Sequence, residues 1–202
     1  SELRLSGNPA LDTRVGPFKG QPDAILCRTN ACAIEEVIAC HVAGIPVAMA
    51  GSAGSEMKRL AEACLELRER GFTGHPELSF FTSWGQVQDY VDQCPEGEDL
   101  AVAVRLIDEH GPETIIEAIE KCADPRWTQT TVSTAHGSKG REWDKVRIAN
   151  DWKDPRDSEG ELLPLADEEL RLAYVAMTRG KVAIDPGTLG RIISDRAMPT
   201  LV

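Results

Sequence analysis

Short apolar segments alternate with helical patterns in two separate parts of this chain, and this alternation restricts its fold more than any other feature. Apolar residues at 24–27 are followed by helical spacing over 30–43 and by a second apolar segment at 47–49. The same kind of order returns late in the chain, where strand-like segments stand at 130–133 and 146–148. Strand–helix–strand order favours a parallel sheet flanked by helices. We therefore predict an α/β fold.

The predicted helices begin and end at residues that favour helix termini. Asn30 is expected to cap the first helix, and Gly44 to end it. A helix through 57–67 should end at Gly71, because glycine readily adopts the left-handed conformation that closes helices. The glycine-rich residues 51–55 are predicted to form a loop. Later in the chain we predict a helix at 165–179, a strand at 182–184 and a helix at 189–196.

The middle of the chain carries helical patterns with no strand between them. Three such patterns cover 84–94, 98–110 and 112–122, with proline and glycine between them at 95–97 and 111–112. We interpret this region as a small helical insertion into the α/β domain. The predicted organisation is an arm at 1–22, an α/β domain formed by 23–71 and 127–202, and a reduced helical insertion at 72–126.

The charge of the chain is unevenly distributed. There are 33 acidic residues against 22 lysines and arginines, which gives a net charge of −11. Such a charge opposes a polyanionic partner unless the acidic residues are segregated. Two stretches, 96–120 and 151–171, together carry −12, which leaves +1 for the rest of the chain. A face that binds nucleic acid is therefore still allowed.

The six cysteines are widely spaced and contain no C-x-x-C pair. We expect reduced and mostly buried thiols, and we predict no metal site, because the four histidines do not stand at the spacing of zinc ligands. No run of about 18 apolar residues is present to cross a bilayer. We expect a cytoplasmic or nucleoid-associated protein, or a nuclear one in a eukaryote, without a membrane partner. The oligomeric state is left open.

Residues 130–144 bring polar side chains to the end of a predicted strand. Thr134 and His136 precede a short Gly-Ser-Lys-Gly turn that contains Lys139 and Gly140. A tight turn that offers backbone N–H groups and a cation suits a phosphate oxygen. The alternative is a plain loop, in which the lysine is solvated and the histidine is an ordinary turn residue.

Residues 168–181 form an amphipathic helical pattern whose last turn carries Thr178 and Arg179. An arginine at a helix end, followed by Gly180, can reach beyond the domain surface while its backbone stays fixed, as a charge-stabilising finger requires. The alternative is that Arg179 and Lys181 only complement the helix dipole. Tyr174, Val175 and Met177 are expected to pack in the core.

Together, these two stretches resemble motifs V and VI of superfamily 1A DNA helicases. Residues 134–142 read T-x-H-x-x-K-G-x-E, and residues 168–181 read E-x-x-R-L-x-Y-V-A-x-T-R-x-K. Residues 24–30, Ala-Ile-Leu-Cys-Arg-Thr-Asn, resemble motif IV and precede the other two motifs in the right order. The short insertion is most similar in layout to the F-box DNA helicase branch. The resemblance implies the RecA-like second motor domain of a UvrD/Rep-like helicase, with a 2B-like insertion.

The resemblance also implies a role for each residue that matches a motif. Both arginines would stabilise charge on the γ-phosphate during transfer, and the motif V glutamate would accept a hydrogen bond from the nucleotide ribose. Neutral donors after the motif V strand would contact the backbone of single-stranded DNA. The implied catalytic residues are Arg179 and Arg28, the nucleotide-binding residues are Glu142, Gly140 and Lys139, and the DNA-binding residues are Thr134, His136 and Asn30.

ATP and Mg²⁺ are the implied cofactors, both held mainly by a first motor domain. The G-x-x-x-x-G-K-[ST] loop of such a domain does not occur in these 202 residues. We therefore expect the C-terminal portion of an ATP-dependent DNA helicase, of the kind that serves DNA repair, which is inactive alone. Its partners would be single-stranded DNA and the missing motor domain. The alternative is a RecA-like remnant that binds DNA or protein without hydrolysis; a nuclease-linked subunit lacks support, because no nuclease carboxylate cluster is present.

Two positions depart from the pattern of the family. Cys27 stands where relatives often have an aromatic residue that stacks on adenine, so base stacking from this domain is not expected. Gly180 stands between the two cations of motif VI, where alanine is common, and should loosen the end of the helix by up to ~1 kcal/mol.

Overall fold

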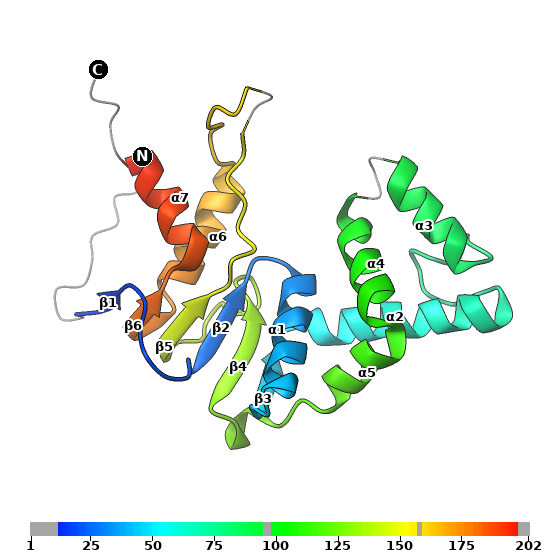
Figure 1. The fold of residues 1–202 in the computed structure, drawn as a ribbon, viewed down its shortest axis with the longest axis horizontal. Coiled ribbons are helices and arrows are strands. Elements are labelled where there is room, and N and C mark those ends of the chain that lie inside the picture. Colours follow the sequence, from blue (N-terminus) through cyan, green and yellow to red (C-terminus); the bar gives the residue numbers. More distant parts are fainter. Residues whose placement is uncertain (1–11, 95–97, 157–158, 198–202) are drawn as a thin grey trace.

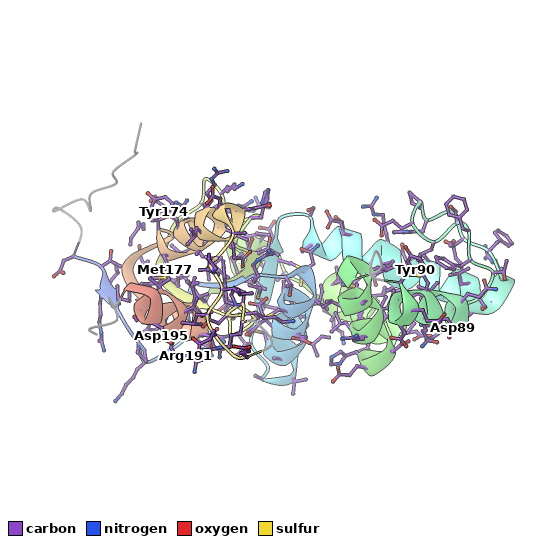
Figure 2. All side chains as sticks on the ribbon, turned by 90° about the horizontal axis from the view of Figure 1, so that it is seen from above. Asp89, Tyr90, Tyr174, Met177, Arg191 and Asp195 are labelled. Atoms are coloured by element: carbon purple, nitrogen blue, oxygen red, sulfur yellow. The ribbon has the colours of Figure 1, made fainter. Side chains whose placement is uncertain are left out.

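The computed structural model describes residues 12–94, 98–156 and 159–197. The first part of the predicted arm, 1–11, and the predicted helix separator at 95–97 lie outside these residues. Seen from above, the molecule is elongated (Figure 2), with α6 and α7 near one end, where Tyr174 and Arg191 are labelled, and α3 near the other, where Asp89 and Tyr90 are labelled.

One sheet forms the centre of the α/β part (Figure 1), and all of its paired strands run parallel. The strand order is β1-β6-β5-β2-β4-β3. The predicted fold class is therefore confirmed. The strands are β1 (Arg14–Val15), β2 (Ala24–Cys27), β3 (Val47–Ala50), β4 (Thr130–Thr134), β5 (Trp143–Ile148) and β6 (Gly180–Asp185).

The predicted helices are present, with shifts of a few residues at their ends. They are α1 (Asn30–Val42), α2 (Ala53–Arg70), α3 (Trp84–Gln93), α4 (Glu98–His110), α5 (Pro112–Glu120), α6 (Asp167–Met177) and α7 (Gly187–Ala197), with a short 3₁₀ helix, η2 (Pro125–Trp127).

Two predictions about helix starts are wrong. Thr29, not Asn30, caps α1: its backbone is extended and its hydroxyl accepts a hydrogen bond from the Cys32 amide at 3.2 Å. The glycine-rich segment 51–55 is not simply a loop, because α2 already begins at Ala53. Gly51 still forms a turn, with φ at 87°, a value that favours glycine.

Helices cover the two faces of the sheet, and the alternation of side chains along β2 shows how. Ala24 and Leu26 belong to the cluster that contains α6 and α7 residues. Ile25 and Cys27 belong to the cluster that contains residues of α1. Successive side chains of a strand point to opposite faces of the sheet, so helices cover β2 on both faces. A strand that is buried on both faces needs apolar residues at every position, and all four residues of β2 are apolar.

A second apolar body lies beside the sheet and is built from helices α2 to α5. Met57, Leu60 and Leu67 of α2 share one buried cluster with Trp84, Val104, Ile107 and Ile115, which come from α3, α4 and α5. Ile34 of α1 joins the same cluster and connects it to the sheet. Helix α2 thus packs mainly with the inserted helices, although it precedes the predicted insertion. The division of the chain into domains stays a prediction.

The order of the strands places three loops together at one edge of the sheet. The chain leaves β2 on one side to form α1 and β3, then crosses back so that β4 and β5 flank β2. The carboxyl ends of β2, β4 and β5 are therefore neighbours, and ligands of open parallel sheets bind at such a switch point.

Candidate functional site

A cleft of about 1080 Å³ opens at the carboxyl edge of the sheet. The turn between β2 and α1, the loop after β4, and helices α2, α4 and α6 all contribute to its walls. Five of the predicted site residues line this cleft: Arg28, Asn30, Thr134, His136 and Lys139. Val175, which was expected to pack in the core, also lines it.

Two carboxylates from distant parts of the chain hold Arg28. Asp151 accepts hydrogen bonds from the Arg28 and Thr29 amides at 2.8 to 2.9 Å and from the Thr29 hydroxyl at 3.1 Å. The Arg28 Nε donates to both carboxylate oxygens of Glu169, at 2.8 and 3.0 Å. This bond raises the pKa of Arg28. In the described part of the chain, the two terminal nitrogens of Arg28 have no hydrogen-bond partner, so they are available to a ligand.

The turn after β4 does not present its backbone to a ligand, contrary to the prediction of a backbone anion site. The amides of Gly137 and Ser138 donate to the hydroxyl and the carbonyl of Thr134, and the Lys139 amide donates to the His136 carbonyl. The Arg141 amide donates to Ser138. Most N–H groups of this turn are therefore already satisfied, and the side chains remain as the available donors.

The side chains of this turn keep donors for a ligand in the cleft. The Thr134 hydroxyl accepts from Gly137 at 3.0 Å, which leaves its own proton free to donate. His136 and Lys139 are exposed. Asn30, the first residue of α1, donates from Nδ2 to Glu56 at 2.9 Å and keeps its amide oxygen.

Arg179 and Glu142 lie at the opposite edge of the sheet, where β5 and β6 begin. Trp143, the first residue of β5, pairs with Gly180, the first residue of β6, and the Trp143 amide donates to the Arg179 carbonyl at 3.0 Å. Glu142 directly precedes Trp143 and is exposed. These two predicted residues are therefore neighbours.

The Arg179 guanidinium bonds only to neutral oxygens. Its nitrogens donate to the carbonyls of Val175 and Arg141 at 2.9 and 3.1 Å and to the Thr178 hydroxyl at 2.8 Å. Within residues 12–94, 98–156 and 159–197, no carboxylate pairs with it. Arg179 thus bonds to the carbonyl end of α6, as the alternative role at the helix dipole predicts, and has no carboxylate partner there.

The prediction that Arg28 and Arg179 meet one γ-phosphate stays a prediction, although the backbones that carry the two side chains lie at opposite ends of α6. Arg28 is bonded to Glu169 in the first turn of α6, whereas Arg179 follows the end of the same helix. Glu169 and Arg179 are about 15 Å apart along α6 at ~1.5 Å per residue. The backbones of the two arginine-bearing segments are therefore well separated in this structure.

Gly180 has a structural role that the motif did not predict. The helix ends at Met177, two residues earlier than predicted, and Gly180 already belongs to β6. A Cβ at this position would lie 2.8 Å from the Ala183 carbonyl oxygen, closer than such atoms approach. Glycine therefore allows the tight entry into β6 and does not loosen a helix.

Gly140 is exposed and has φ at 78°, which restricts this position to residues that accept a left-handed conformation. It lies between Lys139 in the cleft and Glu142 at the opposite edge. The nucleotide-binding roles predicted for Gly140, Lys139 and Glu142 stay predictions.

Sequence reasoning missed three acidic residues of the site: Asp151, Glu169 and Glu56. Asp151 holds the turn that precedes α1 from more than 120 residues away in the chain, and no local pattern indicates such a pairing. Glu169 lies within motif VI, but the motif specifies the glutamate at position 168 and leaves position 169 open.

The described residues contain no candidate membrane-spanning helix, no candidate metal site and no disulfide. None of their helices is both long and apolar enough to cross a membrane. No group of three His, Cys, Asp or Glu side chains among them converges as a metal site. All six cysteines are free thiols, and burial raises the pKa of both Cys64 and Cys122 to about 11.

Comparison with known proteins identifies the family. A family model for the UvrD-like helicase C-terminal domain matches residues 86–184. The chain is also 32% identical, over 182 aligned residues, to F-box DNA helicase protein 1 of Schizosaccharomyces pombe (strain 972 / ATCC 24843). That alignment covers 82% of this chain and 21% of the relative, so the chain spans about a fifth of the relative's length. With its parallel sheet and its three ordered motifs, this chain belongs to the UvrD-like helicase C-terminal domain family.

Proposed function

We propose that this chain is the C-terminal motor portion of an ATP-dependent DNA helicase. It supplies one arginine finger to a nucleotide held mainly by a first motor domain, and it forms part of the track for single-stranded DNA. The family match and the similarity to a protein named as a DNA helicase support a helicase-related role. The placement of the predicted residues at the amino and carboxyl edges of the sheet supports the role that we assign to each of them.

The amino edge of the sheet is the nucleotide side. Arg179 has no carboxylate partner there, so a turn of its side chain away from α6 would let it stabilise the charge that develops on a transferring phosphoryl group. Glu142 is exposed beside it and, as an acceptor, can bind ribose hydroxyls. These side chains fit a nucleotide presented from outside this chain, whose γ-phosphoryl group is the group transferred to water. Mg²⁺ would be held by the first motor domain.

The carboxyl edge is the DNA side. Thr134 and His136 offer donors without base specificity, and Lys139 offers a positive charge. The free terminal nitrogens of Arg28 face the same ligand, so we assign Arg28 to the DNA and not to the γ-phosphate. Asn30 completes this set through its amide oxygen, which can accept from an N–H group of a base.

The observation that carries the proposal is that one short loop joins the two edges. It leaves β4 at Thr134 in the cleft and enters β5 directly after Glu142, next to Arg179. Helix α6 makes the same connection, from Glu169 beside Arg28 to the turn that holds Arg179. DNA in the cleft therefore has two rigid routes by which it can influence the nucleotide side.

A test uses the isolated chain and the chain combined with the first motor domain. We expect the isolated chain to bind a fluorescent single-stranded oligonucleotide at low salt and to show no ATP turnover. Addition of the first motor domain, in the longer protein, should give DNA-stimulated turnover that requires Arg179. Turnover by the isolated chain that Arg179→Ala abolishes would contradict the proposal. DNA binding without turnover, even in the longer protein, would support the alternative, a non-hydrolysing DNA-binding module.

A further inference from the structure

A second cavity, of about 620 Å³, lies over the outer strands of the sheet and shares no lining residue with the cleft. We call it the outer pocket. Figure 1 shows β1, β6 and β5 side by side at the end of the sheet that lies away from the inserted helices. These strands and the segment that follows β1 form the outer pocket. Its lining includes Arg14, Phe18, Lys19, Lys145, Val182 and Ala183.

The pairing of the strands places two of these cations on one face of the sheet. Ala183 of β6 pairs with Arg14 of β1 on one side and with Lys145 of β5 on the other. Paired residues of neighbouring strands point to the same face, and neighbouring strands lie about 4.8 Å apart. The backbones of Arg14 and Lys145 are therefore about 10 Å apart, with a small side chain between them. This spacing leaves room for a ligand.

The face that carries this row of residues is the α1 face. Lys145 and Arg147 lie two positions apart on β5 and so point the same way, and Arg147 donates to Glu36 of α1 at 2.7 and 3.1 Å. Within the described residues, the apolar cluster beneath α1 has members from β2, β3 and β4 and none from β6 or β1. Parallel sheets are usually covered on both faces. The cover that α1 provides therefore stops short of β6 and β1, where the outer pocket lies.

The outer pocket carries an excess of positive charge. Arg14, Lys19 and Lys145 form no ion pair with a carboxylate in the described part of the chain. The carboxylate of Asp23 accepts from the backbone amide of Lys145 at 2.9 Å. Three cations against this one carboxylate contrast with the net charge of −11 of the whole chain. Such a local excess favours an anionic ligand.

Apolar side chains line the same pocket. Val182 is 54% exposed, and Phe18 is partly buried. The sugar–phosphate backbone of DNA brings charge without a large apolar group to fill such a cavity. A peptide can carry carboxylates and a large apolar side chain within a few residues. The combination of cations and apolar side chains therefore favours an acidic peptide over DNA.

We propose that the outer pocket binds an acidic peptide segment of a partner protein. Carboxylates of the peptide pair with the three cations, and one large apolar side chain of the peptide packs against Phe18 and Val182. This interaction goes beyond the proposed function, because the outer pocket is separate from the cleft. A partner held in this way leaves the DNA side of the chain free.

The experiment compares two fluorescein-labelled peptides of equal charge by anisotropy on the isolated chain at low salt. One carries six glutamates around a central Leu-Phe pair, and in the other two serines replace that pair. We expect the first to bind at least about tenfold more tightly, because only it buries a large apolar side chain. Val182→Ala should reduce this preference about threefold. Val15→Ala is the matched control and should leave it unchanged, because Val15 is exposed on β1 outside the pocket.

Lys145→Ala tests the charge of the pocket. It should weaken the binding of both peptides about fivefold, the upper end for one exposed ion pair. Lys153→Ala is the matched control, because Lys153 is exposed and lines neither the outer pocket nor the cleft. Binding of a single-stranded oligothymidylate should stay close to that of the unmodified chain in both variants.

Three results would overturn the proposal. These are no detectable binding of either peptide, equal affinity for the two peptides, and an equal loss of affinity in Lys145→Ala and Lys153→Ala. A 15-base-pair DNA duplex distinguishes the competing ligand. If Lys145→Ala weakened the binding of this duplex while neither peptide bound, the pocket would belong to DNA phosphates and the assignment to an acidic peptide would be wrong.

Discussion

The two arginines taken from the sequence motifs sit in opposite electrostatic surroundings at opposite edges of one sheet. Arg28, at the carboxyl edge, is bonded through Nε to both oxygens of Glu169. Arg179, at the amino edge, is bonded to carbonyls and a hydroxyl. A compensated arginine contributes directed hydrogen bonds and little net charge, whereas an uncompensated one contributes charge as well. The difference suits Arg28 to directed hydrogen bonds with the sugar–phosphate backbone of DNA. It suits Arg179 to a transition state of phosphoryl transfer in which negative charge develops.

Arg179→Ala should have the largest effect of the changes considered. In the longer protein that contains the first motor domain, we expect kcat for DNA-stimulated ATP hydrolysis to fall by a factor on the order of 10³ or more, because a finger at the γ-phosphate is worth that much. Steady-state turnover at saturating DNA measures it. Single-strand affinity should stay unchanged, and a loss of affinity with normal kcat would move Arg179 to the DNA side.

Asp151→Ala tests how the carboxyl edge is held together. The variant removes the acceptor for the Arg28 and Thr29 amides at the start of α1. We expect the free energy of unfolding to fall by about 2 kcal/mol, the scale of backbone amides that lose a charged hydrogen-bond acceptor. Urea unfolding of the isolated chain measures this loss. Asp151→Asn keeps an acceptor and should recover part of this loss. An unchanged midpoint for the alanine variant would show that these bonds do not stabilise the fold.

Glu169→Gln tests the compensation of Arg28 directly. The amide oxygen of glutamine can still accept from Arg28 Nε, so the geometry is kept while the negative charge is removed. The salt dependence of single-strand binding should steepen by up to ~0.7 in the slope of log K against log salt, since one more uncompensated cation meets the phosphates. Glu169→Ala is the control, because it removes the acceptor that holds the Arg28 side chain as well as the negative charge. The loss of this orientation should weaken single-strand binding at every salt concentration. A slope equal to that of the unmodified chain would place Arg28 away from phosphate.

His136→Ala and Lys139→Ala should have the smallest effects, and the two can be told apart. Loss of Lys139 should make the salt slope shallower by up to ~0.7, because one cation no longer meets the phosphates of the single strand. Loss of His136 should weaken binding about equally for all sequences with little change in slope, and should partly uncouple hydrolysis from DNA. Anisotropy titrations over a range of salt concentrations measure both. Unchanged affinity and unchanged DNA stimulation in His136→Ala would make this residue an ordinary turn histidine.

The sequence was sufficient to predict the fold class and most elements, because apolar strands such as 24–27 and helix stops such as Gly71 are local signals. Strand β1 was missed, since its two residues, Arg14 and Val15, form a strand only by pairing with β6 far along the chain. The cap at Thr29 was assigned one residue late, which lies within the uncertainty of helix ends.

The site was only partly predictable, because motifs give the identity of side chains and not the edge of the sheet on which they lie. Topology decides that Arg28 follows the carboxyl end of β2 and that Arg179 precedes the amino end of β6. The turn after β4 looked open to an anion in sequence, yet Thr134 takes up two of its amides. Partners such as Asp151 come from distant segments and leave no local trace.

The central claim, that the two edges bind different ligands, is tested most directly by Arg28→Ala in the longer protein. Single-strand affinity and kcat at saturating DNA should be measured on the same preparation. We predict that affinity falls about tenfold, as for the loss of one charge-assisted contact, while kcat at saturating DNA stays near that of the unmodified protein. A fall in kcat by a factor of about 100 or more, with DNA affinity retained, would place Arg28 at the γ-phosphate and contradict the account.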